Sequence, residues 1–74
     1  MAAPRDYTVT LYRDPAALAA GTVLAMTTGV ERRDTALLIA ARCLAGVDLA
    51  LPAAWGVRVS GPRVDVILTR GAAP

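Results

Sequence analysis

The uncharged run from Pro15 to Val30, sixteen residues long, is the feature that most constrains how this chain can fold. The chain has only 74 residues, and a domain of that size buries only about 60% of the surface that its unfolded chain exposes. Hydrophobic residues nevertheless make up 55% of the sequence. A core this small leaves much apolar surface uncovered, so we expect the chain to form a homodimer that shares its core.

Two helices are predicted in the first two thirds of the chain. The first spans residues 15–28, because Asp14 can cap it, Pro15 suits the first helical position, and Gly29 can end it in the left-handed conformation. The second spans residues 31–45 and ends at a glycine. Glu31 and Asp34 lie in its first turn, where a negative charge interacts favourably with the helix dipole.

Two further segments carry the alternating pattern of strands. Residues 7–13, YTVTLYR, are rich in β-branched and aromatic side chains and are predicted to form a strand. Residues 55–69 are predicted to form a β-hairpin with a type II′ turn at Gly61-Pro62, which pairs Arg58 with Asp65 and leaves one face apolar. The prediction is therefore a single α+β domain over residues 1–74, with the element order β-α-α-β-β.

Several classes of chemistry are disfavoured by the residues that the chain lacks. It contains no histidine, one cysteine (Cys43) and six scattered acidic residues, so we expect no metal site, no cofactor and no enzymatic activity. Cys43 lies in an apolar helical pattern and is expected to be a small buried side chain. The uncharged run is shorter than a membrane span and contains threonines and glycines. Asp6 lies where the apolar core of a signal peptide would be. We therefore expect a cytoplasmic protein without a membrane partner.

Two stretches within residues 7–46, YTVTLYRDP and TGVERRDTALLIAARCLAG, resemble the ribbon-helix-helix unit of small repressors and antitoxins. The resemblance implies that two chains pair their first strands into a ribbon, which enters the DNA major groove, while the helices of both chains share one core. Strand side chains would then contact bases, and the start of the second helix would contact phosphates. The DNA-binding residues that the resemblance implies are Thr8, Thr10, Tyr12, Arg32 and Arg33.

These observations predict a small homodimeric DNA-binding transcriptional regulator or antitoxin, with DNA and a partner protein such as a toxin as further partners. The alternative is a non-enzymatic protein-interaction module or accessory subunit that docks through an apolar helix. For Arg32 and Arg33 the alternative is a solvated first helical turn beside Glu31 and Asp34. The chain also resembles the ribosomal stalk C-terminal domain and the protease adaptor that binds protein N-termini, through its order of strand, acid and proline, helix, glycine and helix. The adaptor resemblance implies that Asp14 binds an amino group.

Overall fold

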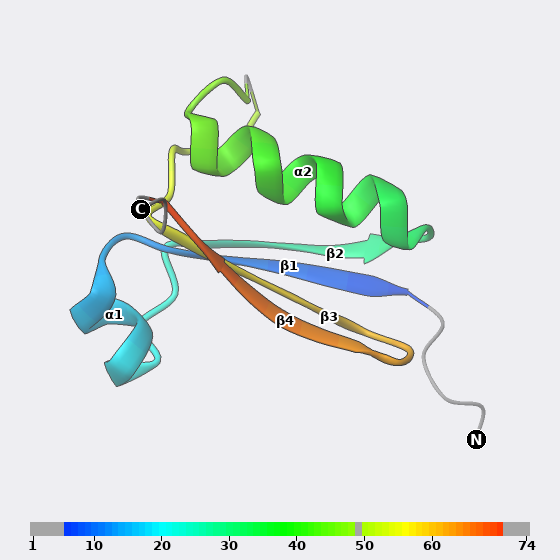
Figure 1. Cartoon of the computed structure of the whole chain (residues 1–74), viewed down its shortest axis with the longest axis horizontal. Coiled ribbons are helices and arrows are strands. Elements are labelled where there is room, and N and C mark those ends of the chain that lie inside the picture. The colour runs from blue at the N-terminus through cyan, green and yellow to red at the C-terminus, as the bar shows by residue number, and fades with distance from the viewer. Residues whose placement is uncertain (1–5, 49, 71–74) are drawn as a thin grey trace.

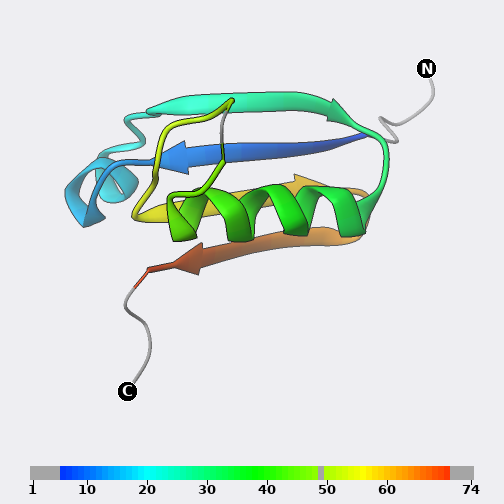
Figure 2. The same ribbon diagram turned by 90° about the horizontal axis from the view of Figure 1, so that it is seen from above.

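The computed structural model describes residues 6–48 and 50–70, which form four strands and two helices (Figure 1). The elements are β1 (Tyr7–Tyr12), α1 (Pro15–Ala20), β2 (Ala25–Val30), α2 (Arg33–Ala45), β3 (Gly56–Gly61) and β4 (Val64–Thr69). The four strands make one antiparallel sheet in the order β2-β1-β3-β4. Helix α2 lies across one face of this sheet, and α1 lies at one end of it (Figures 1 and 2).

The core lies between α2 and the two central strands. Val9 and Leu11 of β1 and Val57 and Val59 of β3 are completely buried, and they pair across the strands as Val9 with Val59 and Leu11 with Val57. The facing side chains of α2 are small and fully buried: Ala36, Ala40 and Cys43. Small helix side chains let α2 approach the sheet closely. The prediction that Cys43 is a buried side chain is confirmed.

The predicted helix over residues 15–28 is wrong in its second half. Helix α1 ends at Ala20 because Gly21 adopts the left-handed conformation (φ 74°), and the amides of Gly21 and Thr22 bond back to Leu18 O and Ala17 O. This is the Schellman arrangement that ends helices at glycine. The chain then joins the sheet, where β2 (Ala25–Val30) pairs with β1. The fold is α+β as predicted, but its order is β-α-β-α-β-β.

The uncharged run gains little burial from this arrangement. Between Pro15 and Val30 only Val30 is buried in the single chain. Its strand, β2, contributes mainly backbone pairing at one margin of the sheet. Large apolar side chains of the run, Val23, Leu24 and Met26, remain exposed. Most of this run therefore lies on the surface of the single chain.

The predicted hairpin over residues 55–69 forms, but its register differs by two residues. The turn lies at Pro62 and Arg63, so Gly61 pairs with Val64 and Arg58 pairs with Ile67. Proline presets the first turn position, and Arg63 takes the positive φ (61°) that the second position of a type II turn requires. A shift of two residues keeps every side chain on its predicted face, because strand side chains alternate with a period of two.

The other predicted elements form with slightly different bounds. Strand β1 ends at Tyr12, one residue before the predicted end of 7–13. Helix α2 begins at Arg33 rather than at residue 31, because Arg32 is in an extended conformation and occupies the cap position. The helix ends at Gly46, as the sequence predicted, and Gly46 adopts the left-handed conformation there.

Candidate functional site

The strand residues predicted to contact DNA lie together on the sheet face opposite α2. Thr8, Thr10 and Tyr12 alternate with the core residues of β1, which places all three on that face. They are poorly accessible there, since Thr10 is 8% exposed and Tyr12 is 7% exposed. A hydroxyl that reads a base edge must reach into the groove. Burial of two of the three side chains limits what this face can offer to DNA.

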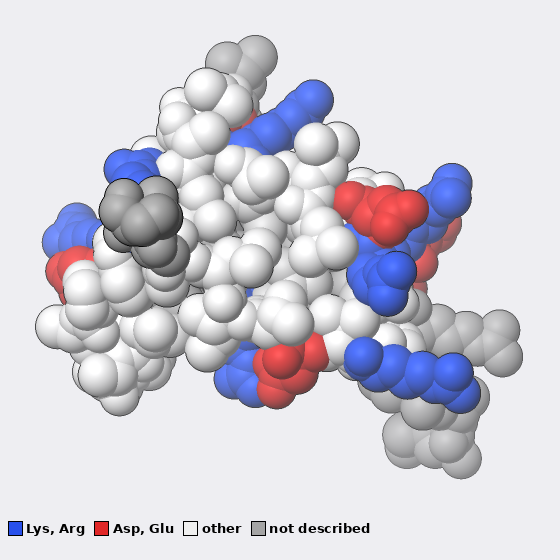
Figure 3. All heavy atoms as spheres, in the orientation of Figure 1, with Lys and Arg blue, Asp and Glu red and all other residues white. Residues whose placement is uncertain are grey.

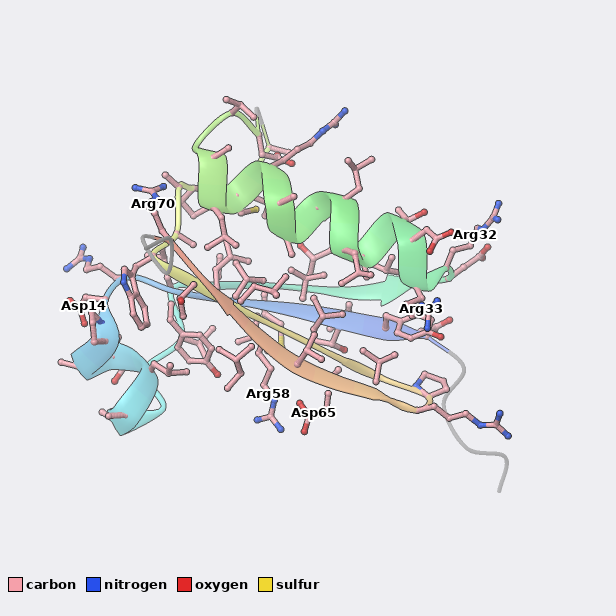
Figure 4. All side chains as sticks on the ribbon, in the orientation of Figure 1. Asp14, Arg32, Arg33, Arg58, Asp65 and Arg70 are labelled. Atoms are coloured by element: carbon pink, nitrogen blue, oxygen red, sulfur yellow. The ribbon has the colours of Figure 1, made fainter. Side chains whose placement is uncertain are left out.

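The two arginines predicted to contact phosphate belong to a different part of the molecule. Arg32 is the cap residue of α2 and Arg33 is its first residue, and both are exposed. Figure 4 shows them at the N-terminal end of α2, and the helix lies on the opposite side of the sheet from Thr8 and Thr10. The structure therefore does not bring the predicted base and phosphate contacts onto one surface.

Strand β1 also lacks the open edge that an intermolecular ribbon needs. It is a central strand, paired with β2 on one side and with β3 on the other, so both of its edges are bonded within the chain. The ribbon implied by the ribbon-helix-helix resemblance requires this strand to pair with its copy in a second chain. That pairing is incompatible with the sheet as it stands. The physical reason is that residues 25–30 form a neighbouring strand rather than the end of a helix.

The open positions in this sheet are at its two margins, and β4 is the more regular of them. Its six residues pair with β3 in unbroken register from Gly61–Val64 to Gly56–Thr69. In the part of the chain that the structure describes, no strand pairs with the other side of β4. Figure 2 shows β4 along one margin of the sheet. A regular marginal strand is a template for pairing with another chain.

A contact just beyond β4 shows which of its backbone groups face β3 and which face outward. The Arg70 amide donates to Trp55 O at 2.7 Å, so residue 70 turns its backbone toward the preceding strand. Hydrogen-bonded positions alternate along an antiparallel strand, so the backbone groups of Val64, Val66 and Leu68 also turn toward β3. The amides and carbonyls that turn outward belong to the other three residues. These are Asp65, Ile67 and Thr69.

Apolar side chains flank these outward-facing backbone groups on both sides. Val66 lies on the α2 side and is 40% exposed, and Ile67 lies on the opposite face and is 50% exposed. Figure 3 shows a mainly uncharged surface across β4 and α2, with charged side chains toward its periphery. We call the outward backbone groups of Asp65, Ile67 and Thr69, together with the side chains of Val66 and Ile67, the β4 edge. Outward backbone groups flanked by apolar side chains are the features of a surface that binds an extended strand.

One ion pair neutralises the single charged residue of β4. The Arg58 guanidinium donates from Nε and Nη2 to the two carboxylate oxygens of Asp65, each at 2.7 Å. Arg58 opposes Ile67 rather than Asp65, so the pair runs diagonally across the two strands, on the side away from α2 (Figure 4). Hydrogen bonding from Arg58 lowers the pKa of Asp65, while burial acts in the opposite direction and the charge of Arg58 adds to the lowering. The β4 edge therefore carries little net charge.

The other margin of the sheet, β2, is interrupted. Its pairing with β1 shifts between Tyr7 and Val9, which marks a bulge, and Gly29 within it has a positive φ of 73°. Bulges of this kind bend a marginal strand and break its hydrogen-bonding pattern, which protects it from pairing with other chains. No such irregularity occurs in β4. The two margins thus differ in their capacity to accept another strand.

A shallow apolar hollow of about 400 Å³ lies beside α1. Its lining residues are Arg13, Asp14, Ala16, Ala17, Ala20, Thr22, Val23 and Leu24. Asp14 accepts a hydrogen bond from the Ala17 amide at 2.7 Å and so caps α1, as the sequence predicted. That bond gives Asp14 a structural role as the cap of α1. The hollow holds no second acidic side chain.

Few groups in the described part of the chain have the chemistry of a reactive site. Residues 6–48 and 50–70 contain no cluster of three histidine, cysteine or acidic side chains that would hold a metal ion. The Cys43 thiol is completely buried, and burial, with a smaller effect from Asp48, raises its pKa above the ordinary value of 9.0. A buried thiol with a raised pKa is a poor nucleophile. No helix among these residues is long and apolar enough to cross a membrane.

The β4 edge was missed by analysis of the sequence, although its signal is present there. The stretch Val64–Thr69, VDVILT, has apolar side chains on one face and Ile67 on the other, with a single charge, which is unusual for a strand with one open side. Strand order decides whether such a stretch is central or marginal, and local patterns do not determine that order. Comparisons of the chain with protein-family models, with curated proteins and with solved structures found no match.

Proposed function

We propose that this protein is a non-enzymatic protein-interaction module that binds an extended segment of polypeptide at the β4 edge. The observation that carries the proposal is the unbroken β4 strand, whose outward amides and carbonyls at Asp65, Ile67 and Thr69 have no partner in the described residues. Strand addition would satisfy these groups. Exposed Val66 and Ile67 would supply apolar contacts on the two faces.

This proposal has better support than DNA binding. A DNA-binding surface needs several cations and accessible polar groups on one face. Here Thr10 and Tyr12 are buried, and Arg32 and Arg33 lie beyond the opposite face of the sheet. DNA binding by a regulator or antitoxin stays a prediction. Its signature is an affinity that falls steeply as salt rises, and Thr10→Ala would alter the sequence preference.

A short peptide tests strand addition directly. The probe is a fluorescent peptide with the sequence of residues 64–70, blocked at both ends, titrated against the protein at low concentration. We expect saturable binding and slower hydrogen exchange at the amides of Ile67 and Thr69, because both amides would become hydrogen-bonded. Ile67→Lys should weaken binding strongly, since it places a charge on the apolar part of the β4 edge.

A matched control exists on the other margin of the sheet. Met26 of β2 lies on the same face as Ile67 and is similarly exposed, at 55% against 50%. Met26→Lys should therefore leave peptide binding unchanged. Absence of peptide binding at concentrations where the chain is monomeric, or equal loss of binding in both variants, would contradict the proposal. Circular dichroism of each variant checks that its fold is retained.

A further inference from the structure

We infer that the polypeptide that occupies the β4 edge is β4 of a second copy of this chain, paired antiparallel about a two-fold axis at Ile67. This inference rests on the proposed function, because both use the same backbone groups. It adds the identity of the partner and the register of the contact. The two four-stranded sheets would join into one continuous sheet with both α2 helices on the same face.

The alternation of inward-facing and outward-facing backbone groups along β4 selects this register. With the axis at Ile67, Ile67 pairs with its own copy and Asp65 pairs with Thr69, so all three outward residues of each chain are bonded. An axis at Val66 would pair Asp65 with Ile67 and leave Thr69 opposite the turn at Arg63. Marginal backbone groups gain most when every donor and acceptor is matched. The Ile67 register is the one that matches all of them within β4.

The side chains are self-complementary in the same register. On the α2 side, Val66 would lie opposite Leu68 of the second copy, so apolar groups meet there. On the other face, Ile67 meets its copy at the axis. Thr69 lies opposite Asp65, and its hydroxyl can donate to the carboxylate. Cross-strand pairs of these types stabilise antiparallel sheets.

Charge does not oppose this association. Asp65 is the single charged residue of β4, and Arg58 of the same chain already neutralises it through two hydrogen bonds. The register also separates the two Asp65 carboxylates, because each lies opposite a threonine. Proteins that keep marginal strands apart place unpaired charges, prolines or bulges on them. Strand β4 has none of these, whereas β2 has a bulge.

The solution mass tests the inference. We expect light scattering across a dilution series to give twice the chain mass of 7.6 kDa for the natural protein and for Met26→Lys. Ile67→Lys should raise the dissociation constant about 100-fold, because two introduced ammonium groups would meet at the axis. A mass of one chain at every concentration would overturn the inference. So would an Ile67→Lys dimer whose dissociation constant equals that of the natural protein.

Cross-linking tests the register without relying on a charged variant. In a hydrogen-bonded antiparallel pair the Cα atoms are about 5.5 Å apart, which a disulfide can span. Ile67→Cys should therefore form a covalent dimer with diamide as oxidant, while Val66→Cys and the natural protein, whose Cys43 is buried, should not. Cross-linking through Val66→Cys in preference to Ile67→Cys would overturn the register.

The two proposals fail in different ways. A monomer that binds the peptide of residues 64–70, and loses it in Ile67→Lys, would overturn the second-copy inference and support strand addition. A monomer that binds no peptide would overturn both. A dimer that Met26→Lys disrupts and Ile67→Lys leaves intact would place the contact at β2 and overturn the second-copy inference alone, because the peptide titration tests strand addition at the β4 edge separately.

Discussion

The ring of Tyr7 in β1 lies against Gly61 in β3, so closely that a side chain at Gly61 would overlap it. A Cβ atom placed on Gly61 would come within 2.9 Å of Tyr7 Cε1 and 3.0 Å of Tyr7 Cγ. The second distance involves the base of the ring, so rotation of the ring about its own axis does not remove the conflict. Gly61 is thus required by packing against Tyr7.

Gly61→Ala should destabilise the fold by about 1–3 kcal/mol, because the tyrosine ring must shift or the strands must separate. Urea unfolding measures this change. Combining the substitution with Tyr7→Ala should remove most of the additional cost, since the overlapping ring is then absent. Gly56→Ala is the control, because its new Cβ would have nothing closer than 3.7 Å. A similar loss of stability for Gly56→Ala and Gly61→Ala would contradict the packing explanation.

The turn at Pro62 and Arg63 stores backbone strain that glycine would relieve. Arg63 is the one described residue other than glycine with a positive φ, at 61°. We expect Arg63→Gly to raise the free energy of unfolding by about 0.5–1 kcal/mol, the relief of the left-handed conformation less the added freedom of the unfolded chain. Arg63→Ala removes the charge but keeps the strain, so it should bring no gain. Equal stabilities of the two variants in urea would argue against strain at this turn.

The pKa of Asp65 should report the ion pair with Arg58. Hydrogen bonding from Arg58 lowers this pKa from its ordinary value of 3.8, so Arg58→Gln should move it back toward that value. Carboxyl chemical shifts followed by NMR against pH measure the change, and Arg63→Gln serves as the control. Because the folded-state pKa is lowered, the stabilising effect is present above pH 3.8 and disappears as pH falls through the folded-state value. A pKa that Arg58→Gln leaves unchanged would exclude the ion pair in solution.

The buried thiol of Cys43 should make stability depend on alkaline pH. Burial raises its pKa above 9.0, so the unfolded chain loses the thiol proton before the folded chain does. The free energy of unfolding should therefore be constant with respect to this group below pH 9.0 and should fall above it. We expect the stability difference between the natural protein and Cys43→Ala to shrink between pH 8 and pH 10 in urea unfolding. A difference that grows over this range would contradict the sign.

The sequence by itself determined the elements whose signals are local. Strand β1 and the hairpin follow from side chains that alternate with a period of two, and a shift of two residues in the hairpin left every face as predicted. Helix α2 follows from its apolar pattern and its closing glycine, and α1 begins where Asp14 and Pro15 place it. Each of these features depends on residues within one turn or one strand pair of each other.

Only the tertiary structure decided that residues 25–30 form a strand, and only it decided the order of the strands. An uncharged run has no charged side chains to reveal its period, and its few threonines do not distinguish helix from strand. Gly21 ends α1, and pairing with the open side of β1 makes Ala25–Val30 a strand. That pairing makes β1 central and, with β3 on its other side, leaves β4 at the margin. The β4 edge therefore arises from contacts between distant segments, which no local pattern encodes.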